Sequence, residues 1–104
     1  VADRGGGAIY ANWNTDVFVS GSRFENNVAI AGNDERGAGG IAFVSPGILR
    51  VTDSVFTGNR GINGAAINSL NGKLTIENTL FRNNDTTAAF YDTGKPNPFL
   101  CGYG

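Results

Sequence analysis

One phrase occurs three times in the chain: VFVSGSRFENN at residues 17–27, LRVTDSVFTGN at residues 49–59 and LTIENTLFRNN at residues 74–84. Each copy begins with an aliphatic residue, has another two positions later, a phenylalanine at the eighth position and an asparagine at the eleventh. Repetition of this kind indicates an array of similar units, in which each unit buries its apolar residues against the next.

A shorter apolar segment with a glycine-rich start precedes each copy of the phrase. The three segments read GGAI at residues 6–9, GGIA at residues 39–42 and GAAI at residues 64–67. Distances within a unit are nearly constant, whereas the connection between units varies in length. In the first phrase Val17 and Val19 are separated by one residue, as in a strand with one buried face. Phe18, Ser20 and Arg23 then fall on the outer face.

The repeat favours one fold over its main competitor. Stacked units cover one another's apolar faces and pair their backbones as parallel strands. An antiparallel sandwich also has short strands and frequent turns, but it gives no reason for identical residue types at identical offsets. We therefore predict an all-β fold, a parallel β-helix of about three coils over residues 1–92. An irregular cap or linker is expected over residues 93–104.

Three rows of equivalent side chains follow from this stacking. The phenylalanines would stack inside as aromatic neighbours. The asparagines would bond to the backbone and to one another at a turn, and hydroxyl groups two residues before each phenylalanine would form the third row. The rows are Phe24, Phe56 and Phe81; Asn27, Asn59 and Asn84; and Ser22, Ser54 and Thr79.

Composition excludes several classes of function. The net charge is −1 and the Lys and Arg residues are dispersed, so there is no basic surface for nucleic acid or an anionic membrane. No apolar run approaches the length of a membrane span. Histidine is absent and Cys101 is the only cysteine, so no disulfide is expected within the chain. The missing initiator methionine suggests a processed protein or a fragment of a longer one.

The motifs resemble those of a known class. Gly-Gly-Ala-Ile at residues 6–9 and the Phe-x-x-Asn pairs at 24–27, 56–59 and 81–84 resemble the repeats of pectate-lyase-like right-handed parallel β-helix proteins. More narrowly, they are similar to the GGAI and FxxN repeats of the chlamydial polymorphic outer-membrane proteins, which are surface adhesins. The resemblance covers about residues 4–90. It implies that the predicted all-β parallel β-helix is right-handed, and it implies an extracellular or cell-surface location. It specifies a fold more strongly than a function.

Polysaccharide cleavage is the activity that this class suggests first. Asn14-Thr15-Asp16 matches a short motif of the polygalacturonases, but the paired Asp, Gly-His-Gly and Arg-x-Lys motifs of those enzymes do not occur here. The tripeptide precedes Val17, where a turn is expected. Glu25, Thr57 and Arg82 share an offset, and we expect a solvated face with at most a weak surface ion pair there. We therefore predict no catalytic residue and no enzyme activity.

Other candidate sites are weaker. Asn33-Asp34-Glu35 groups three oxygen-bearing side chains, but calcium takes about six to eight oxygen ligands, so a solvated loop is expected. Cys101 has no histidine partner for nucleophilic catalysis. Asn84-Asp85-Thr86 is a glycosylation sequon, but its asparagine belongs to the predicted row and would be buried. No metal-binding or cofactor-binding residue is predicted.

Two features point to partners. The aromatic residues outside the rows are candidates for a surface that binds sugar or protein, although Tyr10 and Trp13 are expected to cover a neighbouring turn. These residues are Tyr10, Trp13, Phe18 and Phe43. Three coils also leave two apolar ends, and nothing at residues 1–3 resembles a cap. We therefore predict a structural or adhesive segment that stacks end to end with other copies or adjacent repeats. The alternative is a carbohydrate-binding or polysaccharide-cleaving β-helix.

Overall fold

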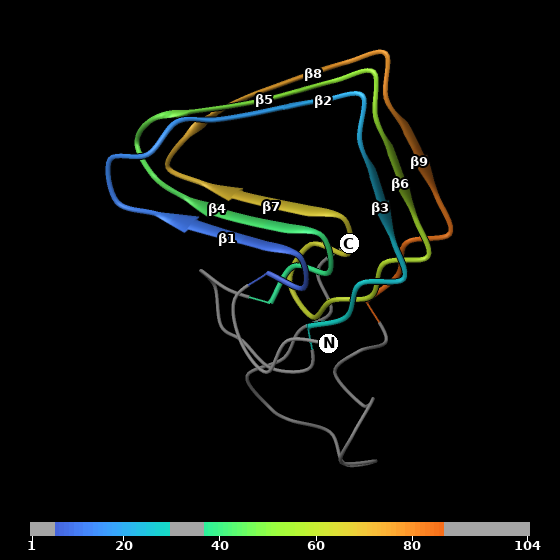
Figure 1. Cartoon of the computed structure of the whole chain (residues 1–104). Coiled ribbons are helices and arrows are strands. Elements are labelled where there is room, and N and C mark those ends of the chain that lie inside the picture. Colours follow the sequence, from blue (N-terminus) through green and yellow to red (C-terminus); the bar gives the residue numbers. More distant parts are fainter. Residues whose placement is uncertain (1–5, 30–36, 87–104) are drawn as a thin grey trace.

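The computed structural model describes residues 6–29 and 37–86, and within these ranges the chain forms nine β-strands and no helix. The strands are β1 (Ile9–Asn12), β2 (Val17–Ser20), β3 (Arg23–Glu25), β4 (Ile41–Val44), β5 (Ile48–Thr52), β6 (Val55–Thr57), β7 (Ile67–Leu70), β8 (Lys73–Glu77) and β9 (Leu80–Arg82). Three strands make one turn of the chain, which we call coil 1 (β1–β3), coil 2 (β4–β6) and coil 3 (β7–β9). Figure 1 looks along the axis on which the coils stack.

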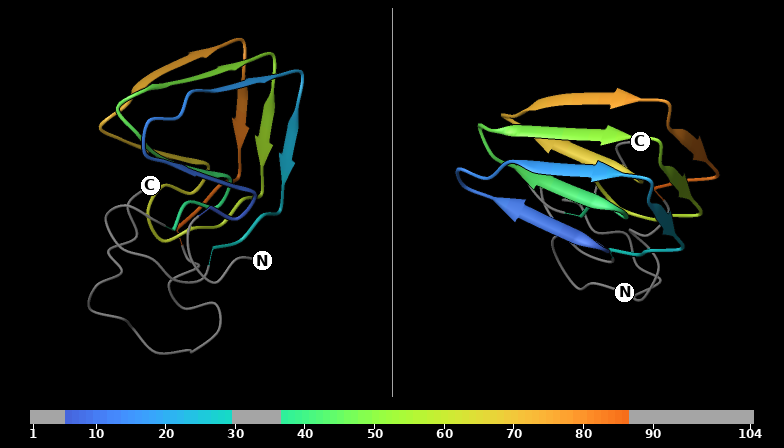
Figure 2. Two further views of the ribbon diagram at one scale, coloured as in Figure 1. Left: turned by 60° about the vertical axis from the view of Figure 1, so that its left-hand side comes forward. Right: turned by 45° about the horizontal axis from the view of Figure 1, so that its top comes forward.

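Equivalent strands of the three coils pair in parallel. They form a first sheet of β1-β4-β7, a second of β2-β5-β8 and a third of β3-β6-β9. The chain runs clockwise in Figure 1 as it moves away from the viewer, and both views of Figure 2 show the same order of coils. The helix is therefore right-handed, and the predicted parallel β-helix of three coils is confirmed. The expected boundary between residues 92 and 93 lies outside the described residues.

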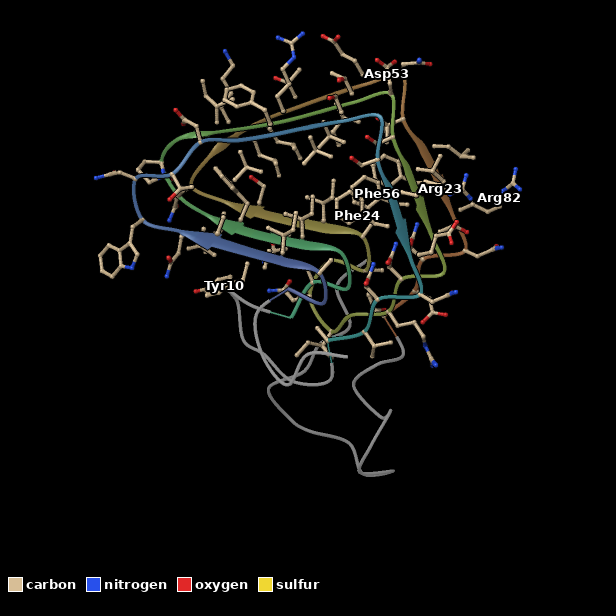
Figure 3. The ribbon with its side chains drawn as sticks, viewed as in Figure 1. Tyr10, Arg23, Phe24, Asp53, Phe56 and Arg82 are labelled. Carbon is tan, nitrogen blue, oxygen red and sulfur yellow. The ribbon has the colours of Figure 1, made fainter. Side chains whose placement is uncertain are left out.

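The phenylalanine column is confirmed. Phe24 pairs with Phe56 and Phe56 with Phe81 in the register of the third sheet. The ring centroids lie 4.5 Å and 5.1 Å apart, and the planes are inclined by only 4° and 13°. Figure 3 shows Phe24 and Phe56 pointing into the coil, whereas Arg23 and Arg82 point away from it. The alternation along each strand thus sets the inner and outer faces.

Coil 2 holds the centre of the core because it is covered on both sides. Ile41 and Phe43 of β4, Leu49 and Val51 of β5, and Phe56 of β6 are fully buried. Phe43 therefore corrects the expectation that it belongs to a candidate surface. It lies two residues after Ile41, which also points inward, so the alternation of β4 directs both side chains into the core.

The asparagine row is also confirmed. Asn59 Nδ2 donates to the Phe24 carbonyl at 2.8 Å and to Asn84 Oδ1 at 2.9 Å. Its Oδ1 accepts from the backbone N–H and the Nδ2 of Asn27, at 3.1 Å and 3.0 Å. The Asn59 side-chain amide therefore bonds both to backbone groups and to the side-chain amides of the neighbouring coils. These bonds offset the free-energy cost of burying the amide.

The hydroxyl row lies at the corner between the second and third sheets. Ser54 Oγ donates to the Thr52 carbonyl at 2.8 Å and accepts from the Ser22 N–H at 3.2 Å. The residue before each hydroxyl adopts a left-handed backbone, which Gly, Asp and Asn tolerate best. These residues are Gly21, Asp53 and Asn78, with φ of 55°, 51° and 47°.

Glycine is required where one coil approaches the next, at the start of the first sheet. A Cβ on Gly7 would lie 2.1 Å from the carbonyl oxygen of Gly39, and a Cβ on Gly39 would lie 2.2 Å from that of Ala65. The equivalent position in coil 3 is Ala65 itself. Within the described residues no coil follows coil 3, so the Ala65 methyl group meets no such carbonyl there.

Candidate functional site

The inner residues of coil 3 are exposed on the side that faces away from coil 2. Leu74, Ile76 and Phe81 have exposed fractions of 40%, 40% and 41%. Their equivalents in coil 2 have an exposed fraction of 0%; they are Leu49, Val51 and Phe56. We call the surface formed by Leu74, Ile76 and Phe81 the C-terminal face. It is an apolar surface made of residues that the repeat places inside.

A hollow opens beside Phe81 on the C-terminal face. Its volume is about 350 Å³, and it is lined by Ala65, Ala66, Phe81, Arg82, Asn83 and Asn84. A second hollow, of about 490 Å³, lies at the corner between the second and third sheets and is lined by Asp53, Ser54, Val55, Asn78, Thr79 and Leu80. Its one carboxylate, Asp53, accepts a bond of 2.6 Å from Asn78 Nδ2. Neither lining has the two carboxylates that glycoside hydrolysis uses.

Strand β8 forms one edge of the C-terminal face. The Lys73 N–H donates to the Gly47 carbonyl at 3.0 Å, and the Glu77 carbonyl accepts from the Asp53 N–H at 3.1 Å. Backbone groups alternate along a strand, so residues 73, 75 and 77 direct theirs toward β5, and Leu74 and Ile76 direct theirs away from it. In the part of the chain that the structure describes, β8 pairs with β5 alone. Such an edge is a template for another strand.

The opposite end of the helix differs from the C-terminal face. The inner residues of coil 1 on β2 and β3 are Val17, Val19 and Phe24; Val17 is half-buried, and Val19 and Phe24 are each only 8% exposed. The two ends are therefore unequal, although the repeat places the same kinds of residue at both. The sequence indicated two open ends and gave no sign of this inequality.

Three exposed aromatic side chains lie on the outside of coil 1, one on β1, one on β2 and one in the turn between these strands. Trp13 is 80% exposed, Phe18 69% and Tyr10 39%. The expectation that Trp13 covers a neighbouring turn is therefore wrong. Trp13 has a left-handed backbone with φ of 63°, which is costly for a bulky residue and turns its side chain outward. Tyr10 lies on the outer side of the first sheet in Figure 3, and Asn12 Nδ2 donates to its hydroxyl at 3.5 Å.

The Asn14-Thr15-Asp16 tripeptide is a turn, as expected. Thr15 Oγ1 donates to the Asn12 carbonyl at 2.6 Å, and Asp16 Oδ1 accepts from the Ile48 N–H at 2.9 Å. The buried Ser45 of the next coil bonds to the backbone of Thr15 through its hydroxyl. The Asp16 carboxylate therefore joins coil 1 to coil 2.

Glu25 and Arg82 lie on an exposed outer face, as expected, and no ion pair joins the two residues. The register sets Thr57 between the two residues, so they lie two coils apart. Glu25 instead accepts from Arg23 on its own strand at 2.7 Å. Arg50 and Glu77 approach to 3.5 Å across one coil boundary. All of these groups are substantially exposed, so the pairs contribute little to stability.

The remaining candidates divide between the described and undescribed parts of the chain. Asn33-Asp34-Glu35 and Cys101 lie outside the described residues. Asn84 is half-buried rather than buried, and its Nδ2 donates to the Phe56 carbonyl at 2.9 Å. Within residues 6–29 and 37–86, no three His, Cys, Asp or Glu side chains gather as a metal site would need. The same residues include no helix with the length and apolarity to cross a membrane.

Comparison with family models, with curated proteins and with solved structures found no match to this chain.

Proposed function

We propose that the chain is a non-catalytic structural or adhesive β-helix segment of an extracellular filament, appendage or surface protein, joined end to end with neighbouring copies or coils. One observation carries the proposal. Residues that the repeat directs inward are fully buried in coil 2 and about 40% exposed in coil 3. Exposed apolar surface of this kind, bordered by an open strand edge, is typical of an interaction site.

The extracellular setting rests on the resemblance of the GGAI and FxxN segments to the repeats of chlamydial polymorphic outer-membrane adhesins. The structural role rests on the chemistry of the described surface. Its carboxylates bond to backbone, to amides or to guanidinium groups, as Asp16, Asp53 and Glu25 do. No pair of them faces a common hollow in the described part of the chain.

Sedimentation velocity over a wide range of concentration tests this proposal on the full 104-residue chain. We expect association to increase with concentration and to fall strongly in Ile76→Lys, which places a charge on the C-terminal face. The matched control is Thr57→Lys, which places the same charge on the outer side of β6 in the middle coil, away from both ends. A chain that remains monomeric throughout, or an equal effect of both substitutions, would contradict the proposal.

Carbohydrate binding is the second candidate function, and the exposure of Trp13 favours it. An aromatic ring held in the open at 80% exposure offers a flat apolar face to a pyranose ring. Trp13 is also the only tryptophan in the chain, so its fluorescence reports on this position alone. Titration with oligosaccharides should shift the emission and saturate if the surface binds sugar. An unchanged spectrum with neutral and acidic oligosaccharides would rule this role out.

A further inference from the structure

We propose that the C-terminal face pairs with the same face of a second copy, so that two chains form a closed tail-to-tail dimer. The dimer is centred on antiparallel pairing of β8 with β8 of the second copy, with Thr75 opposite Thr75. This inference rests on the proposed end-to-end contact and specifies its partner, polarity and register.

The residue order of β8 is complementary to itself in this arrangement. The strand reads Lys73-Leu74-Thr75-Ile76-Glu77. Antiparallel pairing about Thr75 places Lys73 opposite the second copy's Glu77, and Leu74 opposite the second copy's Ile76. The same contacts recur on the other side of the two-fold axis, as an isologous interface requires. Opposite charges and apolar pairs across a strand both stabilise a sheet.

The backbone of β8 fits the same register. Leu74 and Ile76 direct their N–H and C=O groups to the open edge, because Lys73 and Glu77 direct theirs to β5. Leu74 and the second copy's Ile76 would therefore exchange two hydrogen bonds, and the symmetry-related pair two more. Thr75 and Lys73 fall at the positions without backbone bonds, where facing side chains lie closest.

The faces of the paired strands also agree. The axis is perpendicular to the second sheet, so Leu74 and Ile76 of both copies lie on the inner side. There they extend the column of inner residues and cover surface that is about 40% exposed in one chain. Lys73, Thr75 and Glu77 lie on the outer side, where Glu77 also has Arg50 of its own chain at 3.5 Å. The new contact with Lys73 adds a second cation to that carboxylate.

Two observations disfavour head-to-tail stacking, the other end-to-end arrangement. Val19 and Phe24 at the opposite end are only 8% exposed and Val17 is half-buried, so less apolar surface is available there to receive coil 3 than the C-terminal face offers. A parallel layer in the register of the repeat would also set a carbonyl oxygen against the Ala65 methyl group. At the equivalent positions of coils 1 and 2, that carbonyl leaves room only for Gly7 and Gly39.

Disulfide crosslinking tests the register of β8 against β8 of the second copy directly. In a Cys101→Ser background, Thr75→Cys should form a covalent dimer under mild oxidation, because paired positions of this kind lie within disulfide reach. Thr57→Cys, on the outer side of β6 in the middle coil, is the matched control and should stay monomeric. Head-to-tail stacking would instead place position 75 next to Phe18, since β2, β5 and β8 align these residues.

Exchanging the charges of Lys73 and Glu77 provides a second test, which measures the strength of association and needs no disulfide bond. Lys73→Glu would set like charges against each other twice per dimer and should weaken association about tenfold. The double substitution Lys73→Glu/Glu77→Lys restores opposite charges across the axis and should recover most of the affinity. In a head-to-tail stack position 73 would face Asp16, so the double substitution would remain weak.

The outcomes separate the two proposals. Dimers that stop at two chains, crosslink through position 75 and recover in the double variant support the tail-to-tail interface. Association without that crosslink, or growth beyond two chains, would overturn the interface while leaving end-to-end contact in place. A chain that sediments as a monomer at every concentration would overturn both.

Discussion

Coils 2 and 3 have the same kinds of residue at the inner positions of their second and third strands, yet they differ in burial. Leu49 and Leu74 are identical and aligned, and so are Phe56 and Phe81. The first of each pair is fully buried, and the second is about 40% exposed. The difference shows that the alternation of residues along a strand determines which side chains point inward. Whether those side chains are shielded from water depends on a neighbouring coil on each side. Inner residues with a coil on one side only therefore stay partly exposed to water.

Truncation of the aromatic column should show the largest difference between the coils. Phe56→Ala should lower the free energy of unfolding by about 3–5 kcal/mol, because it leaves a cavity between two stacked rings. Phe81→Ala removes a ring that is stacked on one side only and should cost about 1–2 kcal/mol. Urea unfolding of both variants, at concentrations where the chain is monomeric, measures the difference. Equal losses would show that Phe56 gains nothing from its second neighbour.

The asparagine row offers the next largest effect. Asn59→Ala should cost about 2–3 kcal/mol, because it leaves the Phe24 carbonyl and the Asn27 amide groups without partners in the interior. Asn84 is half-buried at the end of the row, and Asn84→Ala should cost about 1 kcal/mol. Thermal unfolding of the two variants provides the comparison. A milder effect at position 59 than at position 84 would contradict the assigned bonds.

The glycine position at the coil boundary gives a smaller difference between coils 2 and 3. Here the test adds a methyl group in coil 2 and removes one in coil 3. Gly39→Ala should destabilise the chain by about 1–3 kcal/mol, since the added methyl group would lie 2.2 Å from the Ala65 carbonyl oxygen. Ala65→Gly, at the equivalent place in coil 3, should cost less than about 1 kcal/mol, mainly through the flexibility of the unfolded chain. Chemical denaturation separates these values. A harmless alanine at position 39 would mean that the coils are spaced more widely.

The smallest expected effect is a gain in stability. Trp13→Asn copies Asn71, which occupies the same turn of coil 3 with φ of 68°. Asparagine tolerates this backbone better than tryptophan, so the free energy of unfolding should rise by about 0.5–1 kcal/mol. The result would indicate that Trp13 contributes to an external contact rather than to folding. A loss of stability would instead show that the ring packs against the protein.

The repeat alone predicted the coil and its three side-chain rows, because equivalent residues recur at nearly constant offsets. The right-handedness of the coil came from the resemblance to β-helix proteins. Phe43 was misplaced even though its spacing from Ile41 indicates an inward position. It lies outside the repeated phrase, and the aligned residues of the other coils, Ala11 and Ser69, are not aromatic. Trp13 could not be placed from the pattern, because the direction of a turn residue depends on its φ.

The inequality of the two ends could not be predicted either. Phe24 and Phe81 are the same residue at the same repeat position, and only their neighbours in space make one buried and the other exposed. The self-complementary order of Lys73 to Glu77 was readable in the sequence. Its meaning depends on β8 lying at an edge in the described part of the chain, however, and the repeat does not show this position.

Hydrogen exchange along β8 tests most directly whether protection comes from the neighbouring coil. In dilute solution, where the chain is monomeric, the Thr75 amide should be protected by β5, and the Leu74 and Ile76 amides should exchange rapidly. At concentrations that favour association, all three should become protected. Strong protection of Leu74 and Ile76 in the monomer would show that the edge of β8 is already covered, and it would contradict an open C-terminal face.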